Sequence, residues 1–187
     1  MFAGVDIGGT GVKVGIVTSK GSILAREYEK YHPEKLEPLD VVELTGLNLE
    51  NLDGIGIGCP GVVKDGGIIH AAANFPSWAD VPLQQLLADT LGHPVTVCND
   101  ADAAILAEQW VGAASGGIND FIMLSTMANI YIEIIYLANV RDKIYLNLHV
   151  ALGTGIGFGV VENGQLVRGG TSAIEGGHMV QLDCFKN

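Results

Sequence analysis

The chain has 187 residues, of which 48% are hydrophobic and 17% are charged, so it can bury one core or two lobes and is not a disordered chain. Its formal net charge of −11 opposes binding to nucleic acid, whose phosphate backbone is bound by Lys and Arg. The longest apolar stretch is too short to span a bilayer. Because the sequence also opens without the basic region typical of a secretory signal, we expect a cytoplasmic protein with no nucleic-acid or membrane partner.

The expected elements alternate between strands and helices along the chain. Runs rich in β-branched residues, bounded by glycine or proline turns, predict strands at 2–7, 12–18, 21–30, 54–63, 94–100 and 120–124 and a hairpin at 156–170. The strand in 54–63 is expected to run into a turn around Pro60 and Gly61. Segment 80–92 predicts a helix, because Pro82 stands near its start and Gly92 stops it. A second helix is expected over 101–114, and 32–52 is a weakly helical connection. This mixture predicts an α/β protein.

The sequence DIGGTGVK (6–13) predicts a glycine turn between the first two strands. Gly8 and Gly9 would let backbone N–H groups approach an anion without interference from a Cβ atom. Asp6 could hold a metal ion through water, and Lys13 could meet a phosphate group. The alternative is a plain glycine hairpin with a turn-capping aspartate, which a short glycine motif leaves open.

A second candidate site lies in VCNDADAA (97–104). A predicted strand delivers Asn99 and Asp100 to its C-terminal end, where open α/β sheets bind ligands. Asp100 could accept a proton from a substrate hydroxyl as a general base. The structural alternatives are a helix N-cap for Asp100 and a helix-dipole role for Asp102.

A second glycine-rich loop, LGTGIGFG (152–159), follows the same logic as the first, with a plain hairpin entry as its alternative. Two such loops with a candidate catalytic aspartate between them indicate a nucleotide gripped by two lobes. Asn74 in AANFPSW, and Glu175 and His178 in EGGH, could bind sugar hydroxyls. Ordinary turns are the alternative for these three residues.

Together with GIGIGCPGVV (54–63), these motifs in this order resemble the ROK family of sugar kinases, and its bacterial-type glucokinases above all. The resemblance covers residues 2–124 and 152–180. It implies an actin-like, ribonuclease-H-like α/β fold of two lobes, in which MgATP and a hexose meet in the cleft. Residues 1–100 would form the N-terminal lobe, and 101–187 would begin a C-terminal lobe that is incomplete.

The resemblance implies a role for each candidate residue. The first phosphate loop would comprise Asp6, Gly8, Gly9, Thr10 and Lys13, with Asp6 holding Mg²⁺ through water. The second would comprise Gly153, Thr154, Gly155 and Gly157. The sugar ligands would be Asn74, Asn99, Asp100, Glu175 and His178. Asp100 would be the catalytic base for in-line attack of the 6-hydroxyl on the γ-phosphorus.

The expected substrates are ATP, with Mg²⁺ as cofactor, and a hexose, for which glucose is the expectation; the assembly could be a homodimer. NDADAA also resembles polyphosphate-dependent glucokinases, so polyphosphate is an alternative donor. A non-catalytic sugar-binding or regulatory protein on the same scaffold is the alternative from another functional class.

Three features depart from the family pattern. The strand FIML normally runs within a few residues into LGTGIG, but here the glycine-free segment 125–151, rich in Ile, Tyr and Asn, intervenes. We interpret it as a retained intron or gene-model error, or else a genuine insertion. The family's cysteine cluster CxCGxxGC after GHM is represented only by Cys184, so zinc is not supported. Because the connection 32–52 is also short, we expect little kinase activity from these 187 residues.

Overall fold

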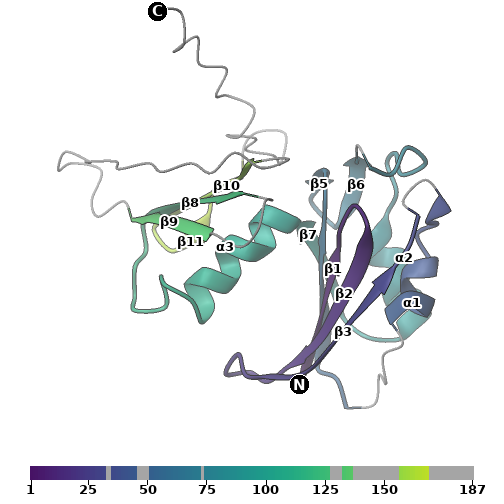
Figure 1. Ribbon diagram of the computed structural model, residues 1–187, viewed down its shortest axis with the longest axis horizontal. Helices are drawn as coiled ribbons and strands as arrows, with labels where there is room; N and C mark the ends of the chain where they lie inside the picture. Colours follow the sequence, from purple (N-terminus) through teal and green to yellow (C-terminus); the bar gives the residue numbers. More distant parts are fainter. Residues whose placement is uncertain (33–34, 46–50, 73, 127–131, 137–155, 169–187) are drawn as a thin grey trace, which may run out of the picture. The chain divides into compact units, whose positions relative to one another are not determined.

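The computed structural model describes residues 1–32, 35–45, 51–72, 74–126, 132–136 and 156–168 (Figure 1). The chain divides into two compact units, Met1–Ala103 and Ala104–Asn187, called here the N-terminal and C-terminal units. Each has its own hydrophobic core. The assignment of 1–100 and 101–187 to two functional lobes stays a prediction. No helix in the described ranges has the length and apolar character needed to cross a membrane.

A five-stranded sheet of order β3-β2-β1-β4-β7 forms the centre of the N-terminal unit. Its strands are β1 (Phe2–Ile7), β2 (Gly11–Val17), β3 (Ile23–Lys30), β4 (Gly54–Cys59) and β7 (Val95–Asn99). The first three form the predicted antiparallel meander, which is confirmed. β4 pairs parallel with β1, and β7 pairs parallel with β4. The carboxyl ends of β1, β4 and β7 therefore meet at one edge of the sheet.

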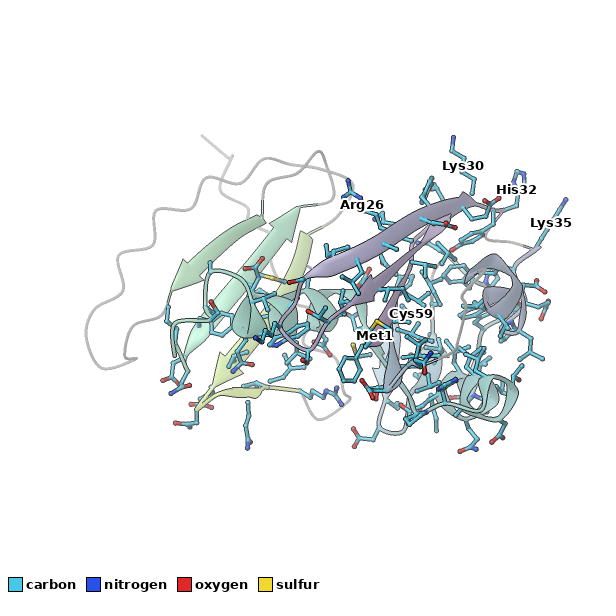
Figure 2. All side chains as sticks on the ribbon, turned by 90° about the horizontal axis from the view of Figure 1, so that it is seen from below. Met1, Arg26, Lys30, His32, Lys35 and Cys59 are labelled. Carbon is cyan, nitrogen blue, oxygen red and sulfur yellow. The ribbon has the colours of Figure 1, made fainter. Side chains whose placement is uncertain are left out.

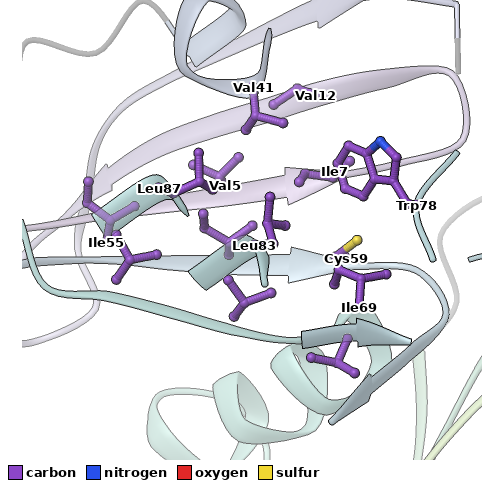
Figure 3. Packing of buried hydrophobic residues seen from close by; sticks show 14 of the residues in the cluster. Val5, Ile7, Val12, Val41, Ile55, Cys59, Ile69, Trp78, Leu83 and Leu87 are labelled. Atoms are coloured by element: carbon purple, nitrogen blue, oxygen red, sulfur yellow. The ribbon is translucent and has the colours of Figure 1, made fainter. Parts of the chain in front are cut away.

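Two helices cover one face of this sheet, α1 (Asp40–Thr45) and α2 (Leu83–Leu91) (Figure 1). Alternate residues of the strands point toward them, so that Val5 of β1, Val41 of α1 and Leu87 of α2 face one another around a small apolar cavity (Figure 3). The predicted helix 80–92 is confirmed but begins later, at Leu83. It ends as expected at Gly92, whose φ of 66° lets its N–H donate to Ala88 O.

The strand predicted over 54–63 ends at Cys59, because the chain turns at Pro60 and Gly61 as predicted. The last two residues of that range belong to a different strand. There β5 (Val62–Lys64) begins a separate hairpin with β6 (Ile68–Ala71). Gly61 makes the turn with a φ of +99°, a conformation that favours glycine. A Cβ atom at this position would lie 2.2 Å from Ala71 O, so the turn also lacks space for a side chain.

The C-terminal unit contains a sheet of order β11-β10-β8-β9. Its strands are β8 (Phe121–Thr126), β9 (Ile132–Tyr136), β10 (Ile156–Glu162) and β11 (Gln165–Leu166). Helix α3 (Asp100–Trp110) contributes Ile105 to its core. The predicted hairpin around Asn163 and Gly164 is confirmed, and both residues have a positive φ, of 52° and 74°.

Part of the compositionally unusual segment 125–151 belongs to this sheet. Ser125 and Thr126 complete β8, and β9 pairs with β8 along its whole length. On its other side β8 pairs antiparallel with β10, with Thr126 opposite Ile156. Since antiparallel neighbours need only a short hairpin loop, the β8–β10 pairing does not itself require the long connection 127–155.

Removing residues 127–151 is expected to preserve the β8–β10 pair, because Leu152 to Gly155 would then join Thr126 to Ile156 as a four-residue hairpin loop. Hydrogen–deuterium exchange should show β10 amides as protected as in the full chain. Removing 132–136 alone is the control, since it deletes β9 but keeps a long connection. Loss of β10 protection in the 127–151 deletion, but not in the control, would contradict the expectation.

Gly61→Ala should be far more destabilising than Gly66→Ala. Both glycines have a positive φ, of +99° and +78°, so both variants lose about 1 kcal/mol to backbone strain. A Cβ atom on Gly66 meets nothing within 4 Å, whereas one on Gly61 collides with the Ala71 carbonyl, which adds about 1–3 kcal/mol. Urea denaturation measures the free energy of unfolding, and equal losses in the two variants would show that the turn is not tightly packed.

Candidate functional site

Parallel strand pairing brings the predicted catalytic and metal-binding carboxylates to one edge of the sheet. The register places Asp6 of β1 beside Gly58 of β4, and Cys59 of β4 beside Asn99 of β7. Asp100 follows directly at the start of α3. Cys59 is fully buried at this edge, and burial, with smaller contributions from the Asp100 and Asp6 carboxylates, raises the pKa of its thiol to about 12. The carboxylates of Asp6 and Asp100 therefore both lie near the Cys59 thiol at this edge of the sheet.

The first glycine loop is a tight connection between β1 and β2. The Gly8 N–H donates to Gly11 O at 3.0 Å, which leaves Gly9 and Thr10 at the tip. In the described ranges, the N–H groups of these two tip residues have no hydrogen-bond partner. Unpartnered N–H groups on a glycine turn can bind an anion, as the sequence predicts for this loop.

Lys13 and Asp6 form an ion pair at the base of this loop, with 2.9 Å between Nζ and Oδ2. Their side chains are 68% and 48% exposed, and an exposed pair of this kind contributes little to stability. Each partner can therefore be exchanged for a ligand at small cost. Mg²⁺ takes one or two carboxylates and keeps several waters, so Asp6 fits a water-mediated magnesium role and Lys13 fits a phosphate.

Two tyrosines contact backbone carbonyls of the loop, and the sequence had not indicated either of them. The Tyr31 hydroxyl donates to Gly8 O, and the Tyr31 N–H donates to Thr10 O at 3.4 Å. The Tyr28 hydroxyl lies 3.5 Å from Thr10 O, and its ring occupies the space where a Cβ atom on Gly11 would lie. Their contacts join positions about 20 residues apart, so only the folded chain reveals them.

Asn74, predicted as a sugar ligand, lies directly against the first glycine loop. A Cβ atom added to Gly9 would lie 3.1 Å from Nδ2 of Asn74, so a side chain here would require the Asn74 amide to shift by a few tenths of an ångström. Asn74 itself is exposed, whereas Phe75 and Trp78 are buried to 1% exposure. Their rings stack with centroids 4.7 Å apart. The motif AANFPSW thus places an exposed amide next to a buried pair of aromatic side chains.

Asn99 holds the corner where β7 runs into α3. Its Oδ1 accepts hydrogen bonds from the N–H groups of Ala101 and Asp102, at 2.8 and 3.3 Å, so it caps the helix. Its Nδ2 donates to Gly61 O at 2.9 Å. Asp100 Oδ1 accepts from the Ala101 N–H at 2.9 Å. Sequence reasoning considered only Asp100 as the cap; the roles of Asn99 in sugar binding and of Asp100 in catalysis stay predictions.

Of the remaining predicted site residues, one lies within the described ranges. Gly157 lies in β10 opposite Ser125. The other members of the second phosphate loop and of the predicted sugar site lie outside the described residues, namely Gly153, Thr154, Gly155, Glu175 and His178, and so does Cys184. Within the described ranges, no group of three or more His, Cys, Asp or Glu side chains could hold a metal ion.

A cationic strip, defined as Arg26, Lys30 and Lys35, runs from the edge strand β3 into the segment that follows it (Figure 2). Arg26 lies opposite Gly15 and Lys30 opposite Gly11, so the strip borders the first glycine loop. Among the described residues, none of its three cations forms an ion pair.

Comparisons with known proteins agree with this architecture. A glucokinase from Thermotoga maritima is 36% identical over 95% of this chain and 50% of its own length. The solved structure of a ROK family glucokinase from Streptomyces griseus, in complex with glucose and AMPPNP, matches with a TM-score of 0.69 and 28% identity, over 93% of this chain and 48% of that chain. The solved structure of an inorganic polyphosphate/ATP-glucomannokinase from Arthrobacter sp. matches with a TM-score of 0.67 and 32% identity, over 97% of this chain and 64% of that chain.

These matches confirm the α/β, actin-like ATPase fold. The chain spans about half the length of the two glucokinases that it matches. The model of the ROK family itself matches residues 2–127. That range contains the first glycine loop, Asn74 and the strand-to-helix corner at Asn99 and Asp100. The chain therefore belongs to the ROK family.

Proposed function

We propose that this chain carries the site of a sugar kinase of the glucokinase type, which transfers the γ-phosphoryl group of ATP to the 6-hydroxyl of glucose, with little activity expected from these 187 residues alone. The observation that carries the proposal is the contact between the Asn74 amide and Gly9 of the first glycine loop. It brings a side chain suited to sugar hydroxyls against backbone suited to phosphate. Asp6 and Asp100 lie at the same edge of the sheet.

Each described group has a distinct part in the proposed reaction. The Gly9 and Thr10 N–H groups and the Lys13 ammonium would bind phosphate oxygens, and Asn74 would orient the hexose. Asp100 would accept the proton of the attacking 6-hydroxyl. Because phosphoryl transfer has a loose transition state with spread negative charge, positioning and charge neutralisation supply most of the catalysis. Mg²⁺, when bound through Asp6, supplies part of that neutralisation.

The Lys13–Asp6 ion pair suits such a site. While the two side chains face each other, the negative charge of Asp6 is balanced without a metal ion. When MgATP arrives, Lys13 can turn to phosphate and Asp6 to the hydrated magnesium ion. The exchange replaces one ion pair by two, so no charge is left unpaired beside the loop. The predicted second loop, Gly153, Thr154, Gly155 and Gly157, would complete the phosphate contacts.

Asp100→Asn and Asn74→Ala should separate catalysis from sugar binding. Asp100→Asn removes the proton acceptor, so ATP-dependent glucose phosphorylation, whatever its size in the wild-type chain, should fall by about 10²- to 10⁴-fold. Asn74→Ala should weaken glucose binding about tenfold in isothermal titration, because a hydroxyl group of the bound glucose loses its hydrogen-bond partner. Asp102→Asn is the matched control, since Asp102 lies in the first turn of the same helix.

Several outcomes would contradict the proposal. Turnover that survives Asp100→Asn would exclude this carboxylate as the base. Glucose binding without any ATP binding would favour the alternative of a non-catalytic sugar-binding protein. A wild-type chain that binds neither ligand would exclude a functional sugar kinase site in these 187 residues.

A second candidate donor, inorganic polyphosphate, is favoured by the cationic strip. Arg26, Lys30 and Lys35 form no ion pair among the described residues, and Lys30 lies opposite Gly11, next to the first glycine loop. Residues four apart on one strand face are separated by about 13 Å, so the strip from Lys30 to Arg26 exceeds the reach of a triphosphate already seated on the loop. A longer polyanion could occupy both the loop and the strip.

Arg26→Glu combined with Lys30→Glu should distinguish the donors. If polyphosphate follows the strip, its affinity should fall by about tenfold or more and depend less on salt, because two charge-assisted contacts are lost. ATP affinity should change little. Lys20→Glu is the control, as it makes one such charge reversal at an exposed position in the turn between β2 and β3. Equal loss for ATP and polyphosphate would exclude a separate polyphosphate track.

A further inference from the structure

Tyr31 touches both halves of the proposed site. Its hydroxyl donates to Gly8 O, and its N–H donates to Thr10 O, so it holds two carbonyls of the first glycine loop. Its ring stacks on Phe75, with centroids 6.2 Å apart and an interplanar angle of 27°. Phe75 follows Asn74 in the chain. Tyr31 is therefore bonded to the loop on one side and packed against the Asn74 segment on the other.

We infer that Tyr31 is a positioning residue that fixes the first glycine loop relative to Asn74, so that phosphate and sugar bind cooperatively. The inference rests on the proposed function, because it names a device of the same site. Tyr31 is not expected to contact either ligand; it acts through Gly8 and Phe75.

The hydroxyl contact orients the N–H group that would bind phosphate. A peptide unit is planar and trans, so the carbonyl of Gly8 and the N–H of Gly9 point in opposite directions. Since the Tyr31 hydroxyl holds the Gly8 carbonyl from one side, the Gly9 N–H must point to the other. That N–H has no partner within the described part of the chain. Without the hydroxyl, a flexible glycine turn could rotate this peptide.

The ring contact fixes the sugar side by a separate route. Phe75 lies between the rings of Tyr31 and Trp78, and the Trp78 indole N–H donates to Leu36 O at 2.8 Å. This aromatic column cannot shift without breaking a buried hydrogen bond. It therefore holds the Asn74 backbone at a set distance from Tyr31. The loop and the amide are thus positioned by one side chain.

A core tyrosine with no such role makes a different prediction. Tyr31 is partly buried, and burial, aided by Cys59 and Asp6, raises the pKa of its hydroxyl above the usual value. If burial of the ring were its whole contribution, Tyr31→Phe would keep the stacking and leave ligand binding unchanged. If the hydroxyl orients the loop, the same variant should weaken phosphate binding while the ring still holds Asn74.

The test is isothermal titration of the full chain with glucose and with inorganic tripolyphosphate, separately and together. In the wild type, each ligand should increase the affinity for the other by the same factor. Tyr31→Phe should lower tripolyphosphate affinity about threefold to tenfold, the loss expected for one hydrogen bond. Glucose affinity alone should change less than about twofold, and the mutual enhancement should disappear. Tyr28→Phe is the matched control, because its hydroxyl makes only a 3.5 Å contact with the same loop.

Hydrogen–deuterium exchange of the free chain provides a readout that needs no ligand. Tyr31→Phe should speed exchange at the Gly8 amide, whose hydrogen bond to Gly11 O closes the loop, with unchanged protection in β4 and β7. A wild type that binds both probes while Tyr31→Phe retains full affinity and the enhancement overturns the inference alone. A wild type that binds neither probe overturns it together with the proposed function. Unchanged exchange at the Gly8 amide in the variant overturns the role of the hydroxyl in holding the loop.

Discussion

The parallel pairing of β1, β4 and β7 is the constraint on which the candidate site depends. It brings Asp6, Cys59 and Asn99 to one edge, although they come from three separate parts of the chain. Gly58 lies close against the start of α3, since a Cβ atom there would be in van der Waals contact with Ala103 Cβ at 3.5 Å and Asp100 Cα at 3.6 Å, which leaves no room for a longer side chain. Helix α3 can thus begin immediately above β4. A larger residue at position 58 would push the Asp100 end of the helix away from the sheet.

The hydrogen bond from Asn99 Nδ2 to Gly61 O also stabilises this edge of the sheet. It joins the end of β7 to the turn that follows β4, while the same amide caps α3. An amide with both polar atoms occupied is held in one orientation, and rigid support of this kind keeps neighbouring site residues in place. Asn99 can therefore serve the proposed site through Asp100 whether or not it also touches a sugar. Its structural and functional roles do not compete.

Local sequence signals predicted those parts of the structure that depend on nearby residues. The meander, the helix ending at Gly92 and the turn at Asn163 and Gly164 follow from glycine placement and alternating apolar residues. The turn at Pro60 and Gly61 was predicted from its residue types, but the β5–β6 hairpin beyond it was missed, because it packs Gly61 against the Ala71 carbonyl ten residues further along the chain. Tyr31 was missed for the same reason, since Gly8 and Phe75 reach it only through the fold. Pattern reasoning found candidate ligands, but not the residues that hold them in position.

The net charge of −11 at first opposes a phosphate-binding function, yet the distribution of charge resolves the conflict. Charges beyond about 8–10 Å are largely screened at physiological salt, so a bound phosphate responds mainly to its immediate surroundings. Those surroundings contain unpartnered N–H groups, Lys13 and the adjacent cationic strip. Nucleic acid is different, because it needs many phosphate contacts spread over a long surface. An acidic chain can therefore exclude nucleic acid and still bind a compact phosphate, provided that its few cations are gathered beside the loop.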